Sequence, residues 1–324
     1  MRRLLLTAAA TVAAITLSAC GTTEPAADDA KKTAEPITLT DATGTKVELD
    51  GPAAKVIGTE WNAVESLVSL GVDPVGVADV KGYKTWDTAV PLKNEPKDIG
   101  TRGEPSMDTV ASLKPDLIVA TTDLPEAAVK QLRKVAPVLT LRPADAADPI
   151  GQMTENLDLI AKATGTTQQA DKLKKQFEAK LAEGAKALAD AGLAGTKYAF
   201  ADGYVVSNQV SIRPYTSGSL IGGVNEKLGL KNAWTVKGDE SYGLAATDVE
   251  GLTKLGDVQF AYIGSEGDKA STPFAGVLAK DKVWTSLPFV KKGDVHRLPD
   301  GIWMFGGPES MNKYIDAVVA ALTK

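Results

Sequence analysis

The sequence predicts an α/β protein with two lobes, each built on a parallel sheet, and a long α-helix that joins them. Three observations support this fold class. The chain has 324 residues, which is more than one hydrophobic core usually organises. Short apolar strands alternate with helical segments in both halves, a pattern typical of parallel sheets covered by helices. An amphipathic stretch of about 24 residues separates the two series and has helical spacing.

Composition and charge exclude several classes of protein. Apolar residues make up 44% of the chain and charged residues 24%, as in ordinary soluble globular proteins. The net charge is -5 and the pI about 5.2, so no broad basic surface is expected and no nucleic-acid partner. One Cys and one His cannot form a disulfide framework or a Cys/His metal site. We therefore expect no metal ligand set of the protein's own.

The N-terminus carries a targeting signal. Arg2 and Arg3 precede an apolar run over residues 4–17, which is too short for a membrane-spanning anchor. The run ends in Leu-Ser-Ala-Cys-Gly, which resembles the bacterial lipobox. This pattern predicts a lipoprotein signal peptide over residues 1–19 and lipidation of Cys20. The alternative is an ordinary secretory peptide with a coincidental Cys.

Residues 20–36 are predicted to be a flexible tether, because Thr, Ala, Asp, Lys and Pro dominate them and such segments bury little apolar surface. A lipidated Cys20 followed by this tether would hold the folded protein on the extracytoplasmic face of the cell membrane. The fold itself would not enter the membrane.

Residues 37–147 are predicted to form the first lobe. Two short strands, 37–39 and 46–49, flank an Asp-Ala-Thr-Gly turn. Apolar runs such as 115–119 are nearly continuous, as expected of strands buried on both faces. The predicted order is strand 56–59, helix 63–70, strand 74–77, helix 107–113, strand 117–121, helix 125–135 and strand 138–141. This alternation predicts a Rossmann-like parallel sheet.

Residues 148–192 are predicted to be a helical linker, and residues 193–324 the second lobe. A helix over 149–163 is followed by a Gly-containing break and a long helix over 168–191. Its apolar residues recur every three or four positions, and its length of about 36 Å matches the width of a lobe. A second alternating series then starts with a strand at 198–201.

Two segments share one layout and suggest that the lobes are related. Residues 106–118 and 247–259 each begin with a Ser or Thr that is a candidate N-cap and have acids in the first turn. Each continues as a short helix, a Gly or Pro break, and an Asp that opens an apolar strand. The alternative interpretation is chance similarity between two βα units.

Signatures of catalysis are missing from the sequence. We find no dinucleotide-binding glycine motif after a strand, no phosphate-binding loop, no nucleophile elbow and no zinc-protease motif. His296 is the only imidazole and lies in an alternating strand, which favours a partly exposed structural role. A surface-anchored hydrolase using Ser219 or Asp residues is the alternative of a different class, but a nucleophile, base and orienting group do not occur together. We expect a binding protein, not an enzyme.

A set of aromatic and arginine residues lies in predicted loops. In a doubly wound sheet, ligands bind outside the carboxyl ends of the strands, where most of these loops fall. Trp and Tyr give a rigid apolar wall with a polar edge, and Arg offers a charged fork to oxygen atoms. The set therefore suits a bulky, oxygen-rich ligand, although loop packing or a surface ion pair is the alternative for any one member. The candidates are Trp61, Tyr83, Trp86, Arg102, Arg213, Tyr215, Tyr242 and Trp303.

Several stretches resemble the lipoprotein substrate-binding components of iron-siderophore ABC importers, the class III, helical-backbone periplasmic binding proteins. The similarity runs from about residue 37 to the C-terminus and is strongest in the first lobe. The stretches are KVIGTEW at 55–61, ESLVSLGVDPVGVAD at 65–79, DIGTRGEPS at 98–106, LKPDLIV at 113–119 and WMFGGP at 303–308. The resemblance implies a ligand cleft between the lobes, a long helix that limits lobe motion, and iron held only within its siderophore.

The resemblance also implies roles for individual residues. Arg102, in Gly-Thr-Arg, carries over as a contact to the chelate, and Arg213 is the candidate from the second lobe. Asp108 and Glu250 match the acids that meet permease arginines, although Glu is usual where Asp108 stands. First-turn acids also stabilise a helix dipole, and Thr247 with Glu250 would make a capping box.

The implied partners are a ferric siderophore, an ABC permease and the membrane, with the protein as a monomer. The candidate residues fit hydroxamate, carboxylate and mixed siderophores alike. Another large chelate, such as haem or a cobalamin, is the alternative cargo within the same class of function. No cofactor is expected apart from the iron inside the ligand.

Overall fold

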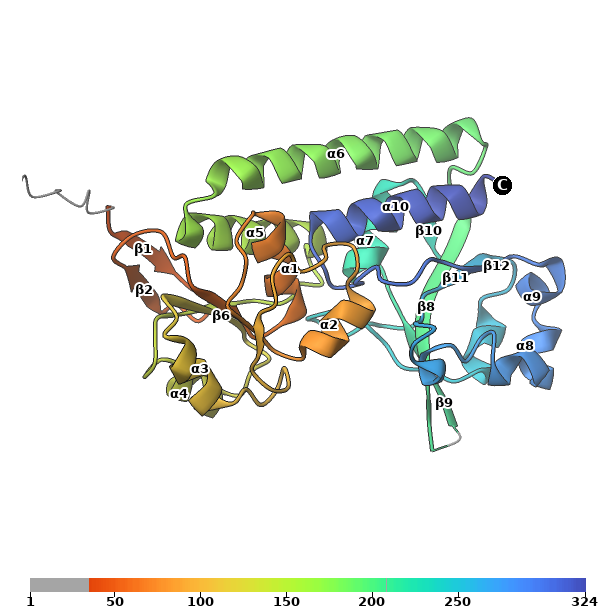
Figure 1. Cartoon of the computed structure of the whole chain (residues 1–324). Helices are drawn as coiled ribbons and strands as arrows, with labels where there is room; N and C mark the ends of the chain where they lie inside the picture. Colours follow the sequence, from red (N-terminus) through yellow and green to blue (C-terminus); the bar gives the residue numbers. More distant parts are fainter. Residues whose placement is uncertain (1–34, 208) are drawn as a thin grey trace, which may run out of the picture. The chain divides into compact units, whose positions relative to one another are not determined.

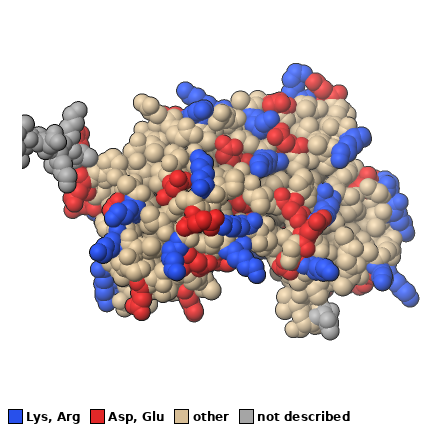
Figure 2. Space-filling model, viewed as in Figure 1, with Lys and Arg blue, Asp and Glu red and all other residues tan. Residues whose placement is uncertain are grey.

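The computed structural model describes residues 35–207 and 209–324. The predicted signal peptide, Cys20 and all but the last two residues of the predicted tether lie outside this part of the chain. No helix in the described ranges is long and apolar enough to cross a membrane. On the face shown in Figure 2, acidic and basic side chains are interspersed, and no broad basic patch is seen.

The first lobe is built on a five-stranded parallel sheet with strand order β5-β4-β3-β6-β7. Every residue of β6 and β7 is buried, which confirms the prediction of a sheet covered on both faces. The strands are β3 (Val56–Gly58), β4 (Gly76–Val77), β5 (Lys97–Asp98), β6 (Leu117–Thr121) and β7 (Val138–Leu141). The helices are α1 (Trp61–Ser69), α2 (Val80–Trp86), α3 (Met107–Leu113) and α4 (Glu126–Leu132). The predicted hairpin forms from β1 (Ile37–Thr40) and β2 (Lys46–Leu49).

The second lobe has a sheet of strand order β10-β8-β11-β12, in which neighbouring strands are parallel. A fifth strand, β9, pairs antiparallel with the long β8. The strands are β8 (Lys197–Val206), β9 (Gln209–Pro214), β10 (Lys231–Asn232), β11 (Gln259–Tyr262) and β12 (Val295–Arg297). The helices are α7 (Leu220–Lys227), η1 (Glu250–Lys254), η2 (Lys269–Ser271), η3 (Val277–Lys280), α8 (Lys282–Ser286) and α9 (Pro288–Lys292).

Long helices connect the two lobes. The predicted linker contains α5 (Pro149–Thr164) and the 24-residue α6 (Thr167–Asp190), and Figure 1 shows α6 beside the C-terminal α10 (Pro308–Leu322). The two helices approach closely at Gly184, where an added Cβ would lie 2.6 Å from Ile315. The prediction of a long connecting helix is confirmed, whereas the boundaries at 147, 192 and 193 stay predictions.

Two predicted local structures differ from the observed ones. The sequence predicts a loop at Tyr83 and Trp86, but both belong to α2, which Asp79 caps by accepting a hydrogen bond from the Gly82 N–H. Seven residues with Gly near the start show too little apolar periodicity to predict a helix.

The second-lobe segment after Thr247 also differs. It forms the 3-10 helix η1, and Asp248, not Thr247, accepts the Gly251 N–H, so the expected capping box of Thr247 and Glu250 does not form. In the matching first-lobe segment, Ser106 caps α3 as predicted, by accepting the Thr109 N–H. Both segments lead into a strand that pairs with the first strand of its own sheet, β6 with β3 and β11 with β8.

A buried carboxylate ties α1 to the start of α10. Glu65 is fully buried and accepts hydrogen bonds from the backbone N–H of Ser310, at 3.0 Å, and from its hydroxyl, at 2.8 Å. A Cβ at Gly306 would lie 2.0 Å from Glu65 Oε2, so only glycine fits there. The Gly-Gly-Pro stretch at 306–308 therefore lets the helix end approach the carboxylate.

A second acid, Asp87, is buried beside this contact. Its side chain is almost inaccessible, and burial, followed by the charge of Glu65, raises the pKa of Asp87 to about 10. Burial likewise raises the pKa of Glu65. Tyr83 and Lys313 also face this pair. Asp87 therefore keeps its proton in the fold at pH values where the unfolded chain releases it.

We predict that Asp87→Asn makes the fold less sensitive to alkaline pH. Because the pKa of Asp87 is raised in the fold, the folded state binds more protons than the unfolded state between the ordinary Asp pKa and about 10. The free energy of unfolding of the natural chain should fall as pH rises through that window. Asn carries no ionisable proton, so the stability of the variant relative to the natural chain should increase with pH.

Urea unfolding at about pH 5, 7 and 9 measures this difference. Asp73→Asn is the matched control, because Asp73 is exposed and precedes β4, at the amino end of the strands of the first sheet. Equal pH dependence in the natural chain and Asp87→Asn would contradict the prediction.

Candidate ligand-binding site

A cavity of about 460 Å³ is lined by residues from both lobes. The first lobe contributes residues that directly follow β3 and β6, which are neighbours in the middle of the sheet. Since the chain leaves these two strands toward opposite edges of the sheet, the cavity lies at the topological switch point, where α/β sheets bind ligands. The lining residues are Thr59, Glu60, Asn62, Arg102, Gly103, Thr121, Asp123, Leu124, Tyr204, Arg213, Tyr242, Leu244, Trp303 and Phe305.

Another depression, of about 510 Å³, lies at the opposite end of the same sheet. Residues 48–53, 115–116 and 135–137 line it. None of these side chains is aromatic or basic. This depression therefore offers neither an aromatic wall nor a positively charged hydrogen-bond donor to a bulky, oxygen-rich ligand. The first cavity is therefore the better candidate for the site.

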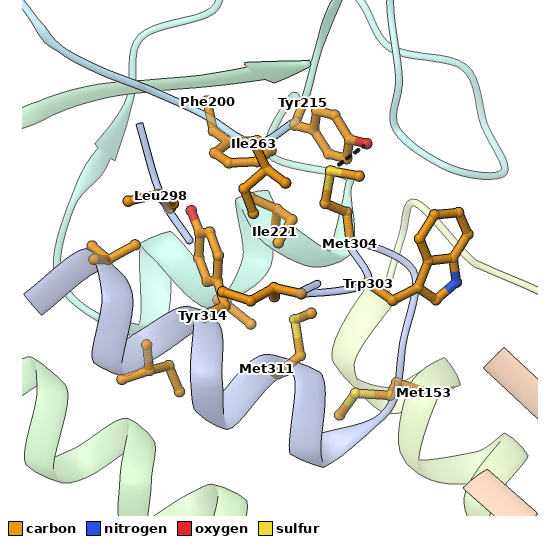
Figure 3. Close-up of a cluster of buried hydrophobic side chains, with 14 of the residues drawn as sticks. Met153, Phe200, Tyr215, Ile221, Ile263, Leu298, Trp303, Met304, Met311 and Tyr314 are labelled. Carbon is orange, nitrogen blue, oxygen red and sulfur yellow. Dashed lines mark hydrogen bonds between the residues drawn. The ribbon is translucent and has the colours of Figure 1, made fainter. Parts of the chain in front are cut away.

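The aromatic wall of the cavity comes from the second lobe. The ring centre of Phe305 lies 5.1 Å from that of Trp303 and 5.5 Å from that of Tyr242. Figure 3 shows Met304 directed toward Tyr215 in the core, while the indole of Trp303 points away from both of these side chains. Tyr204, on β8, adds a fourth ring to the lining. These rings offer a broad apolar surface with polar edges.

Arg102 is held between an aromatic ring and a carboxylate. Its guanidinium carbon lies 4.0 Å from the ring centre of Trp61, and Nη1 donates to Glu60 Oε1 at 2.6 Å. Trp61 is buried, and its indole N–H donates to the carbonyl of Ala78 at 3.1 Å. The Trp61 ring thus supports the guanidinium from behind. The Arg102 side chain is 37% exposed, so it can still reach a ligand.

Arg213 has the same type of support in the second lobe. Its Nε donates to Asp202 Oδ1 at 2.9 Å, and Nη2 donates to Oδ2. The two residues are direct neighbours on β9 and β8. Tyr215 donates its hydroxyl to Asp202 at 3.2 Å, and Phe305 lies 5.4 Å from the guanidinium carbon. The Arg213 side chain is 35% exposed. Its two hydrogen bonds to Asp202 fix the direction of the guanidinium.

The electrostatics of this pair depend on burial. Burial raises the pKa of the Asp202 carboxyl, and the charge and hydrogen bonds of Arg213 oppose that shift. For Arg213, burial works against the charged form, but the contacts with its partners outweigh it and raise the pKa. Burial also raises the pKa of Tyr204 to about 12, so this ring meets a ligand as a neutral phenol.

The cavity unites four of the eight predicted ligand-binding residues: Arg102, Arg213, Tyr242 and Trp303. Trp61 and Tyr215 lie one layer behind, where they support the arginines. Tyr83 is a correction: it is fully buried, and its hydroxyl donates to the carbonyl of Val90 at 2.6 Å.

Trp86 is absent from the lining of the cavity. It is half-buried, with its ring centre 6.5 Å from that of the lining residue Tyr204. Because α2 replaces the expected loop, Tyr83 faces the core and Trp86 packs at the helix end. Neither position offers a ring to the cavity.

Several cavity residues were missed by sequence reasoning. They are Thr59, Glu60, Asn62, Gly103, Thr121, Asp123, Leu124, Tyr204, Leu244 and Phe305. The sequence could have indicated the residues after β3 and β6, because they directly follow the two predicted central strands. No sequence pattern indicated Tyr204, since β8 extends beyond its predicted end and carries this ring into the site.

Tyr242 and Asp123 connect the lobes across the cavity. The Tyr242 hydroxyl donates a hydrogen bond to the Asp123 carboxylate. Burial and this contact raise the pKa of Tyr242. Among residues 35–207 and 209–324, no Lys, Arg or His nitrogen lies within 4.0 Å of the Asp123 carboxylate. Asp123 is therefore a carboxylate at the cavity without a cationic partner in the described chain.

The remaining candidates have structural explanations or exposed positions. The half-buried His296 lies on β12 with Nε2 2.6 Å from Gln259 Oε1, as the structural interpretation predicted. Ser219 is buried as the N-cap of α7, where its hydroxyl is committed to the backbone. Asp108 and Glu250 are exposed in the first turns of α3 and η1. In the described ranges, no three His, Cys, Asp or Glu residues are grouped to hold a metal ion.

Comparison with known proteins assigns the chain to a family. The sequence profile of the periplasmic binding proteins matches residues 56–301, which is most of the chain and includes both sheets. The chain belongs to the periplasmic binding protein family. This confirms the resemblance seen in the sequence.

Curated relatives extend over most of the chain. The iron(3+)-hydroxamate-binding protein FhuD of Escherichia coli is 24% identical over 270 residues, which cover 81% of this chain and 84% of that protein. The Fe(3+)-citrate-binding protein YfmC of Bacillus subtilis is 27% identical over 259 residues, which cover 80% and 77% of the two chains. By their names, these relatives are binding proteins.

Solved structures share the two-lobed fold. FhuD from Vibrio cholerae, bound to Fe3+-Desferal, superposes with a TM-score of 0.71 at 24% identity and covers 83% of this chain and 98% of its own. The triscatecholate siderophore-binding protein FeuA from Bacillus subtilis, with ferri-bacillibactin, gives a TM-score of 0.71 at 21% identity and covers 88% and 98%. At these identities the likeness shows the fold.

We predict that the two cavity arginines differ in their effect on stability. Among the described residues, Arg213 is the only cationic neighbour of the Asp202 carboxylate, which is 2% exposed, so Arg213→Met should lower the free energy of unfolding by about 3 kcal/mol. Glu60, the partner of Arg102, lies closer to water than Asp202 does. Arg102→Met should therefore lower the free energy of unfolding by less than about 1 kcal/mol.

Urea unfolding of both variants at neutral pH makes the comparison. Adding Asp202→Asn to Arg213→Met should restore part of the loss, because no charge is then buried. If Arg213→Met and Arg102→Met lost the same free energy of unfolding, or if the double variant recovered none of it, the predicted difference between the two arginines would be contradicted.

Proposed function

We propose that this chain is an extracytoplasmic solute-binding protein of an ABC importer, which captures a ferric siderophore and delivers it to the permease. The observation that carries the proposal is the pair of arginines, one from each lobe, that face one cavity with an aromatic wall. Each guanidinium has a fixed direction and an exposed part. Together they can donate hydrogen bonds to the oxygen atoms that surround iron in a chelate.

The chemistry of the cargo fits the lining of the cavity. A siderophore supplies all the ligands of its iron, so the protein has to recognise only the outside of the complex. The rings of Tyr242, Trp303 and Phe305 can pack on its organic scaffold. The names of FhuD and YfmC, which refer to ferric hydroxamate and ferric citrate, support an iron chelate as cargo. No residue of the described lining favours haem or a cobalamin.

The proposal includes the surroundings of the protein. Lipidation of Cys20 would anchor it on the extracytoplasmic face of the cell membrane, and Asp108 and Glu250 would meet the permease, one from each lobe. Exposed first-turn acids are accessible to arginines of a partner. In this role the protein acts as a monomer, catalyses no reaction and uses no cofactor of its own.

We predict that Arg102→Gln weakens binding of the ferric siderophore about tenfold or more, because it removes a charged donor at the cavity while the Trp61 ring stays in place. Titration with a panel of ferric siderophores, followed by quenching of Trp fluorescence, measures the affinity. Arg297→Gln is the matched control, since its side chain is 32% exposed, bonded to two carboxylates and outside the cavity. Unchanged affinity in Arg102→Gln would refute the site.

We also predict that Asp108→Lys combined with Glu250→Lys leaves siderophore affinity unchanged but lowers uptake by whole cells about tenfold, because like charges would then face the permease arginines. Uptake of radioactive iron in cells that depend on this protein is the measurement. Asp73→Lys is the control for a charge reversal elsewhere on the surface. Normal uptake with the double variant would rule out these residues as the docking contacts.

A further inference from the structure

The charges around the cavity do not sum to a positive site. Arg102 is paired with Glu60, and Arg213 with Asp202. After these two pairs cancel, Asp123 is the one charged side chain left in the described lining. A site with two arginines thus presents a net negative charge to its cargo.

Iron chelates differ in charge according to the chemistry of their ligands. Each hydroxamate carries one negative charge, so three of them neutralise ferric iron, and an added ammonium group makes the complex a cation. Each catecholate carries two negative charges, so three of them around ferric iron leave the complex with three negative charges. An uncompensated carboxylate at a partly desolvated site disfavours an anion and favours a cation.

Asp123 is placed to make this distinction. It follows β6 at the switch point of the first sheet, and its side chain is exposed at the cavity. Its Oδ2 accepts a hydrogen bond from the neutral hydroxyl of Tyr242, and its Oδ1 accepts no hydrogen bond from any residue in the described ranges. The carboxylate can therefore accept hydrogen bonds from a ligand while it keeps its contact with Tyr242.

We propose that the cavity selects ferric chelates of neutral or positive net charge, as tris-hydroxamates are, and that Asp123 accepts a cationic group of the ligand. The inference rests on the proposed function and narrows its substrate class. Similarity does not decide this point, because the relatives and solved structures include binders of hydroxamate, citrate and triscatecholate complexes. The proposal rests on the ion pairs of the cavity and on the place of Asp123 in its lining.

Three probes of graded charge test the proposal on the purified chain. They are ferric desferrioxamine B, which carries a free ammonium group, its N-acetylated neutral form, and a ferric tris-catecholate. Fluorescence titrations of the natural chain should give the highest affinity for the cation, about fivefold lower affinity for the acetylated form, and at least about hundredfold lower affinity for the tris-catecholate.

Asp123→Asn isolates the carboxylate, because Asn keeps an oxygen that can accept from Tyr242. This variant should bind the cationic and acetylated hydroxamates equally, while Asp73→Asn should keep the natural preference. A preference unchanged by Asp123→Asn would overturn the role of Asp123. Tris-catecholate binding as tight as hydroxamate binding would overturn the charge selection but leave the proposed function intact. If none of the three iron complexes bound while another siderophore of the panel did, this inference alone would fail; if no ferric siderophore of the panel bound, the proposed function would fail with it.

Discussion

Pairing each cavity arginine with a carboxylate and an aromatic ring is the constraint on which the site depends. A free guanidinium on a loop would sample many directions, whereas Arg102 lies on Trp61 beside Glu60, and Arg213 forms a bidentate pair with Asp202. This arrangement fixes the donors before any ligand arrives, so less side-chain entropy is lost on binding. It also removes the positive charge that two arginines would otherwise present.

The lobes can share one site because the frame between them is well packed. Helices α6 and α10 meet at Gly184, and the Glu65 carboxylate binds the first turn of α10. This second contact buries an acid, which costs free energy that the Ser310 hydrogen bonds offset. The loops after β3 and β6 and the β8–β9 hairpin are thereby held around a common cavity. Tyr242 and Asp123 add a hydrogen bond across it.

Most of the fold could be predicted from the sequence, whereas the site could be predicted only in part. Buried parallel strands and the long helix α6 have strong periodic patterns, so their type and order were correct. The helix α2 is short and contains Gly82, and tertiary contacts decide its structure, so no local pattern indicates that Tyr83 faces the core. The carboxylates that pair with the arginines, such as Asp202, could not be predicted for another reason. Pairing across strands depends on their register, which no local pattern reveals.

The central claim is that the cavity holds an intact ferric chelate and that the protein supplies no ligand to the iron. Native mass spectrometry of the protein after incubation with a mixture of ferric siderophores tests it most directly. The account predicts a one-to-one complex whose added mass equals that of one ferric siderophore, with the protein binding some members of the mixture in preference to others. Detection of ligand-free protein alone, or of protein with iron but without siderophore, would contradict the account.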